Sequence, residues 1–435
     1  MAEITPIRGY RYSTRIPDPA AVIAPPYDVI DQPAQQLFYA RHPYNIIRLE
    51  YGAALPEDSA TNNRYTRAAE LFKQWRKEGV LVEENQPALY LYEQTFTVDG
   101  RRRTRRGFFC GLKLEPYGAN ILPHEETLPA AKADRLALLS ACRAQFSPIF
   151  GLYSDPAQRL NRLLTSICRD EPVYAFTDDE QQAHRLWVVT DTETITTVKT
   201  FLANQRVFIA DGHHRYETAL KYRAQRRAAG APSGIAPYDW TLTLLVNIYD
   251  PGLVILPTHR LVKTPPDFAL ADFLAAAGSL FTIQKAEKRR LLSPSGKYAF
   301  GLHTRNEGFI LTLKKGLDPA EIIGADKPPV WKRLAVNVLH ALLLEKHLGI
   351  SESECAAENR IGYTHSPAEA LALVKNGTWD LAFFIGPPEI TEVIAVAEAG
   401  EKMPQKSTYF YPKVPTGLVI YSLDAHAANA APAGG

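Results

Sequence analysis

The sequence predicts a protein of α/β to α+β class, built from mixed sheets and helices in two halves. Apolar runs of strand length alternate with longer segments of helical periodicity in the first half. The pattern breaks at Asp250-Pro-Gly252 and then restarts, and 435 residues are enough for two domains. We therefore expect an α/β domain over residues 1–250, an α+β domain over residues 251–424, and a disordered tail over residues 425–435.

The composition is that of an ordinary globular protein. Hydrophobic residues make up 46% and aromatic residues 10% of the chain, which is enough to fill its cores. The net charge is only +2, so no overall basic field draws the chain to nucleic acid or to a membrane. No apolar run approaches membrane-spanning length, and we expect a cytoplasmic protein. The four cysteines are widely spaced, which fits neither a disulfide framework nor a zinc cluster (Cys110, Cys142, Cys168 and Cys355).

Turn residues and periodicity define the elements of the first half. Pro25 and Pro26 make a rigid loop that enters a short helix. Alternating residues on both sides of Asp99-Gly100 predict a hairpin over residues 89–114. Apolar spacing predicts further helices over residues 61–79, 132–143 and 194–203 and from Arg215, with strands over residues 45–51, 207–210 and 241–249.

The second half continues with its own pattern of strands and helices. Gly349 ends a long apolar run, which predicts one helix over residues 331–348. Ser366-Pro-Ala-Glu369 is a capping box with Pro at the first helical position, and Gly377 closes that helix. The remaining elements are strands over residues 253–256, 379–385 and 408–421, three strands between residues 281 and 314, and helices over residues 266–276 and 389–399.

The segment Val207-Phe-Ile-Ala-Asp-Gly-His-His-Arg-Tyr216 holds the densest set of functional groups. A buried strand ends at Asp211, and Gly212 allows the turn because it accepts positive φ. The basic residues that follow fall on the first turn of a helix (His213, His214 and Arg215). Backbone N–H groups and the positive dipole end attract anions there, so the segment predicts a phosphate-binding site. The alternative is a solvated loop whose histidines cap the helix.

A second group of functional residues follows Pro123. His and Glu side chains transfer protons or bind metals, while Lys and Arg neutralise a phosphoryl group in transfer. The candidates are His124, Glu125, Lys132, Asp134 and Arg135. The alternative is a surface loop whose acidic residues cap the following helix.

The third candidate segment is 402–413, whose Lys406, Ser407 and Thr408 could donate to a phosphate or a carboxylate. It is not a P-loop, because the glycine required four residues before the lysine is absent. The alternative is a strand with polar residues at its start. The arginines of Arg101-Arg-Arg-Thr-Arg-Arg106 are interpreted as a solvated hairpin, because strand alternation divides them between two faces.

Four ordered motifs resemble the signatures of one family, the domain of unknown function one thousand and fifteen. The motifs are Ala24-Pro-Pro-Tyr-Asp-Val-Ile30, Pro123-His-Glu-Glu-Thr127 with Lys132-Ala-Asp-Arg135, Ala210-Asp-Gly-His-His-Arg-Tyr216, and Met403-Pro-Gln-Lys-Ser-Thr-Tyr-Phe-Tyr-Pro-Lys413. The resemblance spans nearly the whole chain. By itself it implies no activity.

The central motif, Asp211-Gly-His-His-Arg215, is similar to the nucleotide-binding motif of ParB/sulfiredoxin-like proteins and of free serine kinases. The resemblance implies a ParB/sulfiredoxin-like nucleotide-binding element in the first half. It also implies a phosphotransferase that uses ATP or ADP with Mg²⁺ and acts on a small hydroxy metabolite, free L-serine being the best candidate.

Local chemistry suggests roles for the residues of that reaction. Asp211 would repel a polyphosphate unless a cation lay between them, so we expect it to orient Mg²⁺. Gly212, the first-turn amides and Arg215 would hold the phosphates, and His213 or His214 would donate to phosphate oxygens. Glu125 is the first candidate for the base and Glu50 the second. Carboxylate or phosphate groups would be held by Lys132, Arg135 and Lys406.

Three other classes of function stay open. A ParB-like, nucleic-acid-associated nucleotide switch would use the same phosphate pocket but lacks a recognisable helix-turn-helix. A metal-dependent phosphohydrolase could be built on His124, Glu125, Asp211, His213 and His214. A non-catalytic ligand-binding protein is the third possibility. The expected partners are a nucleotide and a small-molecule substrate, without a membrane, and the chain could form an oligomer.

Overall fold

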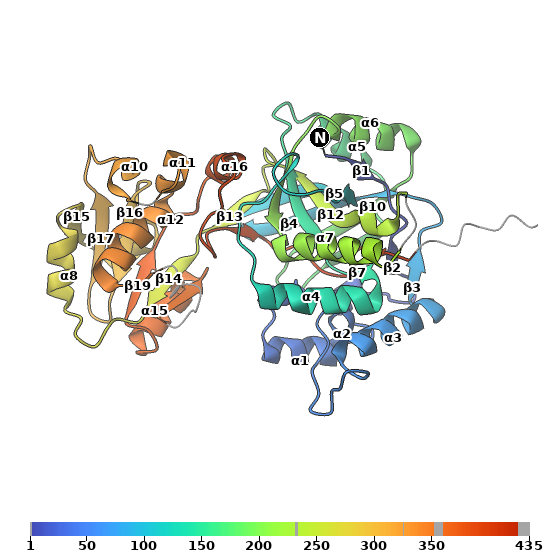
Figure 1. Ribbon diagram of the computed structural model, residues 1–435, viewed down its shortest axis with the longest axis horizontal. Coiled ribbons are helices and arrows are strands. Elements are labelled where there is room, and N and C mark those ends of the chain that lie inside the picture. Colours follow the sequence, from blue (N-terminus) through green and yellow to red (C-terminus); the bar gives the residue numbers. More distant parts are fainter. Residues whose placement is uncertain (1, 231–233, 325, 352–359, 425–435) are drawn as a thin grey trace, which may run out of the picture. The chain divides into compact units, whose positions relative to one another are not determined.

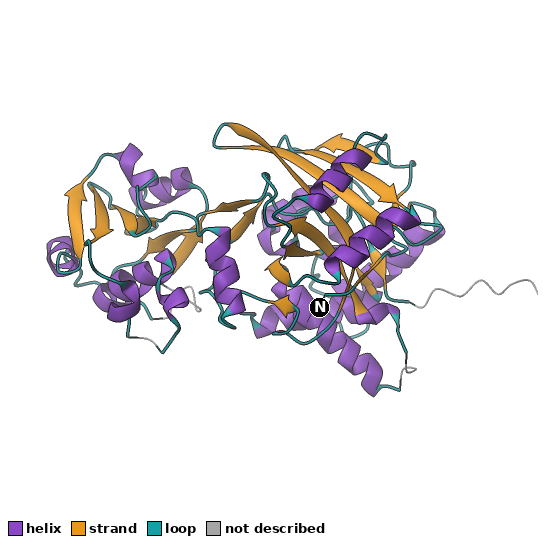
Figure 2. Cartoon of the chain, turned by 90° about the horizontal axis from the view of Figure 1, so that it is seen from above, coloured by secondary structure: helices purple, strands orange, loops and turns teal. Residues whose placement is uncertain are grey.

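The chain forms two compact units of mixed α/β content in the computed structural model (Figure 1). The structure describes residues 2–230, 234–324, 326–351 and 360–424, so the expected disordered tail lies outside the described residues. Unit 1 comprises residues 1–123, 127–253 and 412–435, and unit 2 comprises residues 124–126 and 254–411. Residues 412–424, which we expected in the second half, thus belong to unit 1. The predicted class of mixed sheets with helices is confirmed (Figure 2).

Unit 1 is organised around one mixed sheet of nine strands. Its order is β6-β11-β8-β12-β5-β4-β10-β9, with β1 paired to β5. Only two of these pairs are parallel, β11 with β6 and β12 with β8. The strands are β1 (Ile4–Thr5), β4 (Leu89–Val98), β5 (Arg101–Lys113), β6 (Ile121–Leu122), β8 (Ile149–Tyr153), β9 (Tyr174–Thr177), β10 (Ala183–Val189), β11 (Val207–Asp211) and β12 (Trp240–Asn247).

Helices cover the sheet of unit 1, with α7 packed on α4 and α4 on α3 (Figure 1). They are α1 (Gln32–Arg41), α2 (Ile47–Glu50), α3 (Arg64–Lys77), α4 (Pro129–Cys142), α5 (Arg159–Ile167), α6 (Thr192–Leu202) and α7 (His213–Ala228). Short turns of 3-10 helix lie at Pro19–Ala21, Tyr27–Val29 and Pro237–Asp239. Two small sheets pair β2 (Tyr10–Tyr12) with β3 (Leu81–Glu83) and β7 (Ala144–Gln145) with β21 (Tyr421–Ser422).

The hairpin expected around Asp99-Gly100 is present as β4 and β5, and both turn residues have positive φ, 50° and 70°. The strand expected over residues 45–51 is wrong, because Ile47–Glu50 forms the helix α2. The side chain of Asn45 accepts from the Ile47 N–H at 3.0 Å and donates to two carbonyls of the loop 21–23. These hydrogen bonds of Asn45, together with the burial of Ile47 and Leu49, override the β propensity of residues 45–51.

Unit 2 contains an antiparallel sheet of six strands in the order β15-β17-β16-β19-β14-β18. Its strands are β14 (His259–Val262), β15 (Phe281–Lys285), β16 (Ala299–His303), β17 (Gly308–Leu313), β18 (Ile361–Thr364) and β19 (Leu381–Phe384), and β13 (Val254–Leu256) pairs separately with β20 (Tyr409–Tyr411). Its helices include α8 (Leu270–Ala277), α9 (Lys288–Leu292), α10 (Pro319–Ile322), α15 (Pro367–Lys375) and α16 (Ile390–Glu398).

The single helix expected over residues 331–348 is wrong. The chain instead forms α11 (Pro329–Lys332), α12 (Ala335–Leu339), a π-helical turn (His340–Glu345) and α13 (Lys346–Leu348). Leu334 is extended between α11 and α12, and the Asn337 side chain donates to the Trp331 carbonyl at 2.6 Å. Apolar periodicity therefore located the buried segment but could not detect its break.

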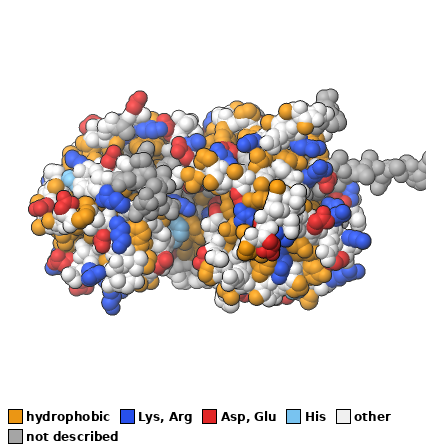
Figure 3. Space-filling view, turned by 60° about the horizontal axis from the view of Figure 1, so that its bottom comes forward, with side chains coloured by type: hydrophobic (Ala, Val, Ile, Leu, Met, Phe, Trp, Pro, Cys, Tyr) orange, Lys and Arg blue, Asp and Glu red, His pale blue; other side chains and the backbone are white. Residues whose placement is uncertain are grey.

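No helix in the described part of the chain combines the length and apolar character needed to cross a membrane. Basic and acidic side chains are interspersed on the face that Figure 3 shows, in keeping with the small net charge.

Gly252 lies where the chain leaves unit 1 and packs closely against the backbone of β5. A Cβ atom at this position would lie 2.3 Å from the Thr104 carbonyl oxygen and 2.4 Å from the Arg105 backbone nitrogen. Both contacts are with the backbone of β5, which cannot move without disturbing the sheet. We expect Gly252→Ala to lower the free energy of unfolding by about 1–3 kcal/mol in denaturant titrations.

Gly386→Ala is the matched control, because a Cβ atom there meets nothing within 4 Å. Its free energy of unfolding should stay within about 0.5 kcal/mol of wild type. Equal stability of the two variants would contradict the close packing of Gly252 on β5.

Candidate functional site

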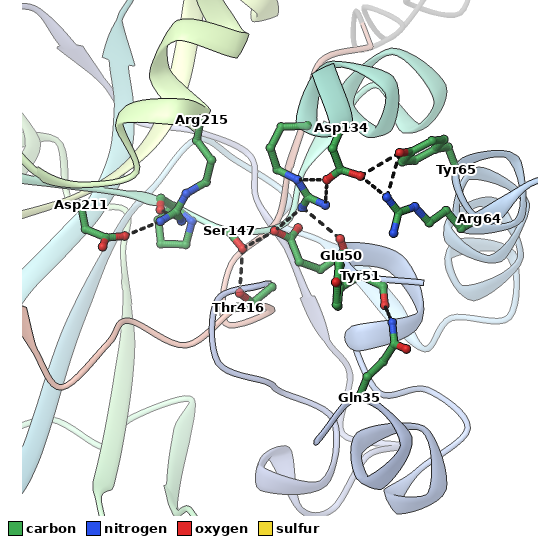
Figure 4. Close-up of polar contacts among 12 residues, drawn as sticks. Gln35, Glu50, Tyr51, Arg64, Tyr65, Asp134, Ser147, Asp211, Arg215 and Thr416 are labelled. Atoms are coloured by element: carbon green, nitrogen blue, oxygen red, sulfur yellow. Dashed lines mark hydrogen bonds and ion pairs between the residues drawn. The ribbon is translucent and has the colours of Figure 1, made fainter. Parts of the chain in front are cut away.

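A small pocket in unit 1 brings one carboxylate and two guanidinium groups together. Its cavity volume is about 40 Å³, and Glu50, Arg135 and Arg215 are among its lining residues. Glu50 ends α2, Arg135 lies on α4, and Arg215 lies in the first turn of α7. Figure 4 shows Glu50 and Arg215 on either side of Ser147, which precedes β8. The pocket therefore has room for a group of a few heavy atoms beside one acid and two cations.

Glu50 is buried and is held by hydrogen bonds on its side chain (Figure 4). Its Oε1 accepts from Arg135 Nη1 at 3.0 Å and from Ser147 Oγ at 2.9 Å. The hydroxyl of Ser147 also shares a hydrogen bond of 2.7 Å with that of Thr416. Burial raises the pKa of Glu50, while Arg135 and Arg215 oppose that rise. The Glu50 carboxyl group therefore holds its proton up to a higher pH than an exposed Glu does.

A second acid and an aromatic ring fix the orientation of Arg135. Asp134 Oδ2 accepts from Arg135 Nε at 2.7 Å, and Asp134 Oδ1 accepts from the Tyr65 hydroxyl at 2.7 Å and from Arg64. The Tyr27 ring lies 3.9 Å from the guanidinium carbon of Arg135. Although burial acts to raise the pKa of Asp134, Arg135 and the other donors lower it. Asp134 therefore holds one edge of the Arg135 guanidinium through Nε, and the Nη1 atom on the other side bonds Glu50.

The segment singled out around Asp211 forms a strand, a turn and a helix. Strand β11 ends at Asp211, Gly212 adopts φ of 90°, and α7 starts at His213. Since L side chains rarely adopt such a φ, only glycine turns the chain here without strain. A Cβ atom on Gly212 would also lie 3.0 Å from Arg215 Nε, so the glycine lets Arg215 fold back over the turn.

Asp211 is neutralised by two cationic side chains. Its Oδ2 accepts from Arg215 Nη2 at 2.6 Å, and its Oδ1 accepts from Lys413 Nζ. Arg215 Nη1 also donates to the Pro148 carbonyl, next to Ser147. Burial would raise the pKa of Asp211, but Lys413 and Arg215 outweigh it and hold the pKa well below its usual range. Lys413 and Arg215 therefore favour the carboxylate form of Asp211.

The described residues do not fit the Mg²⁺ site expected at Asp211. Both of its oxygens already accept hydrogen bonds from Lys413 and Arg215. Among the residues that the structure describes, no group of three or more His, Cys, Asp and Glu side chains could hold a metal ion. The metal-dependent phosphohydrolase hypothesis relied on such a group of residues.

Two other predicted residues of unit 1 already have partners. The His214 Nε2 atom accepts a hydrogen bond from the Leu128 N–H at 2.8 Å, and burial lowers the pKa of His214. Lys132 donates to Glu217 at 2.9 Å. His214 is thus neutral with its proton on Nδ1, which is the nitrogen left to donate to a ligand. His213 begins α7 with a buried side chain.

The remaining predicted residues lie together in unit 2. His124 Nε2 and Thr408 Oγ1 are 2.8 Å apart. The backbones of Glu125 and Met403 form an isolated parallel β-bridge. Ser407 donates to the Pro404 carbonyl at 2.6 Å, and Lys406 adopts φ of 58°. The segments 124–126 and 406–408 therefore adjoin each other although some 280 residues separate them in sequence.

Sequence reasoning missed several residues of unit 1. Ser147, Thr416 and Lys413 were not assigned roles, and only Lys413 lay in a segment singled out in advance. The interpretation of the hairpin arginines as solvated is wrong for Arg105, which is 1% exposed. Alternation along β5 turns that one side chain inward, where it lies over the Phe150 ring at 4.9 Å.

The chain belongs to the family described as "Protein of unknown function (DUF1015)". The family model matches residues 4–337, which is most of the chain. This confirms the family resemblance; three of the four motifs lie within the matched residues, and the motif at residues 403–413 lies beyond them. Comparison with the curated proteins found no match.

Several solved structures resemble this chain weakly. A conserved hypothetical protein from Pyrococcus furiosus is 14% identical, with a TM-score of 0.33, covering 68% of this chain and 90% of its own. A free serine kinase in complex with AMP is 14% identical, with a TM-score of 0.32 and coverages of 69% and 89%. SbnI from Staphylococcus aureus, with a C-terminal truncation, is 12% identical, with a TM-score of 0.31 and coverages of 68% and 82%. At this level, neither ligands nor site residues transfer to this chain.

Ser147→Ala tests the hydrogen bonding of Glu50. The bond from Ser147 helps to lower the pKa of Glu50, so its loss should move that pKa further upward. The free energy of unfolding should fall by about 1 kcal/mol. Titration of the Glu50 carboxyl carbon by ¹³C NMR measures the first effect. Ser166→Ala, at an exposed position of α5, is the control, and an unchanged Glu50 titration in Ser147→Ala would contradict the network.

Proposed function

We propose that this chain is a nucleotide-dependent phosphotransferase that acts on a small hydroxy metabolite. The observation that carries the proposal is the buried Glu50 carboxyl, which shares one pocket with the guanidinium groups of Arg135 and Arg215. Phosphoryl transfer needs a base for the attacking hydroxyl and positive charge around the transferred group. The pocket supplies both, and Arg135 Nη1 lies 3.0 Å from Glu50 Oε1.

Glu50 takes the role of general base in this proposal. The acceptor hydroxyl loses its proton to the Glu50 carboxylate as its oxygen forms a bond to the terminal phosphorus of the donor. The bond between that phosphorus and the bridging oxygen breaks, and the shortened nucleotide leaves with the electron pair. Arg135 and Arg215 neutralise the charge on the phosphoryl oxygens during transfer.

The size of the pocket favours a small acceptor. A cavity volume of about 40 Å³ holds a hydroxymethyl group or a few atoms more, but not a sugar or a peptide. The similarity of Asp211-Gly-His-His-Arg215 to the motif of free serine kinases makes L-serine the first acceptor to test. ATP and ADP are the first donors to test. No step of the proposed reaction is assigned to a metal.

Glu50→Gln tests the assignment of the base. The amide preserves the shape of the side chain but cannot accept the proton, so turnover should fall by roughly 10²- to 10⁴-fold while nucleotide binding persists. Phosphoserine formation from L-serine with ATP or ADP, followed by ³¹P NMR, measures turnover. A panel of other small hydroxy compounds extends the assay if serine is inert.

Glu125→Gln is the comparison variant, because Glu125 was the first candidate from sequence. Loss of turnover in Glu125→Gln together with normal turnover in Glu50→Gln would assign the base to Glu125 instead. Binding and turnover unaffected in both variants would refute the proposed use of a carboxylate base.

The pH dependence of turnover follows from the raised pKa of Glu50. Only the carboxylate accepts a proton, so turnover should rise with pH through a midpoint above 4.5, the ordinary value for Glu. The same shift makes Glu50 stabilise the fold below pH 4.5 and lose that contribution as pH rises through its raised pKa. Glu50→Gln should therefore flatten this part of the stability curve. A wild-type midpoint at or below 4.5 would contradict the assignment.

A further inference from the structure

Three of the side chains that line the pocket of unit 1 carry a hydroxyl group. Ser147 bonds the carboxyl group of Glu50. Thr241 Oγ1 donates to Gln145 Oε1 at 3.3 Å. The Thr218 hydroxyl, in contrast, has no hydrogen-bond partner among the described residues, although the residue is only 3% exposed. Thr218 is therefore the hydroxyl of this pocket that is left to bond a ligand.

Thr218 lies on α7, three residues after Arg215. Residues three apart share one face of a helix, and both of these side chains line the pocket. A threonine within a helix often bonds the carbonyl four residues before it, and Thr165 of α5 bonds the Asn161 carbonyl in this way at 2.7 Å. The Thr218 hydroxyl makes no such bond within α7. It is therefore not used to stabilise its own helix.

A buried hydroxyl group without a partner destabilises a fold, because it gives up its hydrogen bonds to water. Apolar side chains of the same pocket, such as Leu138, Phe146 and Ile149, offer the Thr218 hydroxyl no partner. Valine has the same shape as threonine and would avoid this cost. A side chain that costs stability in this way, beside an acid and two cations, is typical of a residue that serves binding.

We propose that Thr218 is a specificity-determining residue that recognises the hydroxyl group of the acceptor in this pocket. The inference rests on the proposed phosphotransferase function and names a residue that selects its acceptor. A hydroxyl group both donates and accepts, so Thr218 can donate to the acceptor oxygen while that oxygen directs its own proton to Glu50.

Hydrogen bonding, not size, is what lets this pocket distinguish acceptors. A volume of about 40 Å³ admits a hydroxymethyl group and a methyl group alike. A methyl group would leave the buried Thr218 hydroxyl without a partner, whereas a hydroxymethyl group pairs with it. The ligand class is therefore a small metabolite that ends in a hydroxymethyl group.

Thr218→Val tests this role through binding alone, because it keeps the shape of the side chain and removes the hydroxyl. Isothermal titration of the full chain with L-serine and with L-alanine gives the dissociation constants, with and without AMP, which has no phosphoanhydride to transfer. We expect Thr218→Val to bind L-serine roughly tenfold more weakly and L-alanine as tightly as wild type does. Its thermal unfolding midpoint should not fall, because no hydrogen bond within the described part of the protein is lost.

Thr165→Val is the matched control, since it removes a helical hydroxyl at an exposed position of α5 and should bind both amino acids as wild type does. If Thr218→Val does not fold, Thr218→Ala and Thr218→Ser take its place. Both variants lack the methyl group, and only Thr218→Ser keeps the hydroxyl, so it should bind L-serine roughly tenfold more tightly than Thr218→Ala.

An unchanged preference for L-serine over L-alanine in Thr218→Val would show that the hydroxyl bonds only water and would overturn the inference. Equal affinities of Thr218→Ala and Thr218→Ser for L-serine would overturn it as well. If another hydroxy compound of the assay panel binds in place of L-serine, the same comparison is made with that compound and its deoxy analogue.

The outcomes also separate this inference from the proposed function. Wild-type affinities in Thr218→Val, with turnover lost in Glu50→Gln, would overturn the role of Thr218 and leave the phosphotransferase in place. Weaker binding of L-serine in Thr218→Val with normal turnover in Glu50→Gln would support Thr218 and refute the base. Failure of the wild-type chain to bind L-serine or any hydroxy compound of the panel would overturn both proposals.

Discussion

The ion pair between Glu50 and Arg135 is the constraint on which the site of unit 1 depends. Both side chains are nearly inaccessible, at 4% and 6% exposure, so losing either one would leave a buried charge without its partner. The pair joins α2 to α4, and Asp134 and Ser147 extend the network to α3 and to the start of β8. Burial favours the neutral acid, whereas the two guanidinium groups favour the carboxylate. This opposition is what allows one carboxyl group both to stay buried and to exchange a proton.

The sheet of unit 1 also places Asp211 and Arg215 near the ion pair of Glu50 and Arg135. Strands β8 and β11 are neighbours, so Pro148, just before β8, and Asp211, at the end of β11, come within reach of one side chain. Arg215 bonds to both and also lines the pocket with Glu50. The strands and helices of unit 1 thus fix an acid and two guanidinium groups, and groups held in this way need little reorganisation during a reaction.

Local patterns predicted the parts of the structure that local forces decide. An apolar run followed by Gly212 gave the strand, turn and helix around Asp211, because a positive φ there requires glycine. The isoleucines before Glu50 favoured a strand, yet bonds from Asn45 to a distant loop make that run helical. Ser147 and Thr416 are 269 residues apart, and no local signal could pair them. Glu125 stood out because acidic and basic groups cluster around it in sequence, whereas Glu50 acquires its cationic neighbours only through the fold.

The order of segments along the chain has a consequence for biosynthesis. Lys413 and Thr416 belong to unit 1 but follow the residues of unit 2 in the sequence. Strand β21, which comes after them, pairs with β7. A nascent polypeptide that still lacks Lys413 already contains Glu50, Arg135 and Arg215, but not the ammonium at Asp211. The cluster is therefore whole only after residue 413 has been translated, and fragments released by the ribosome before that point lack part of it.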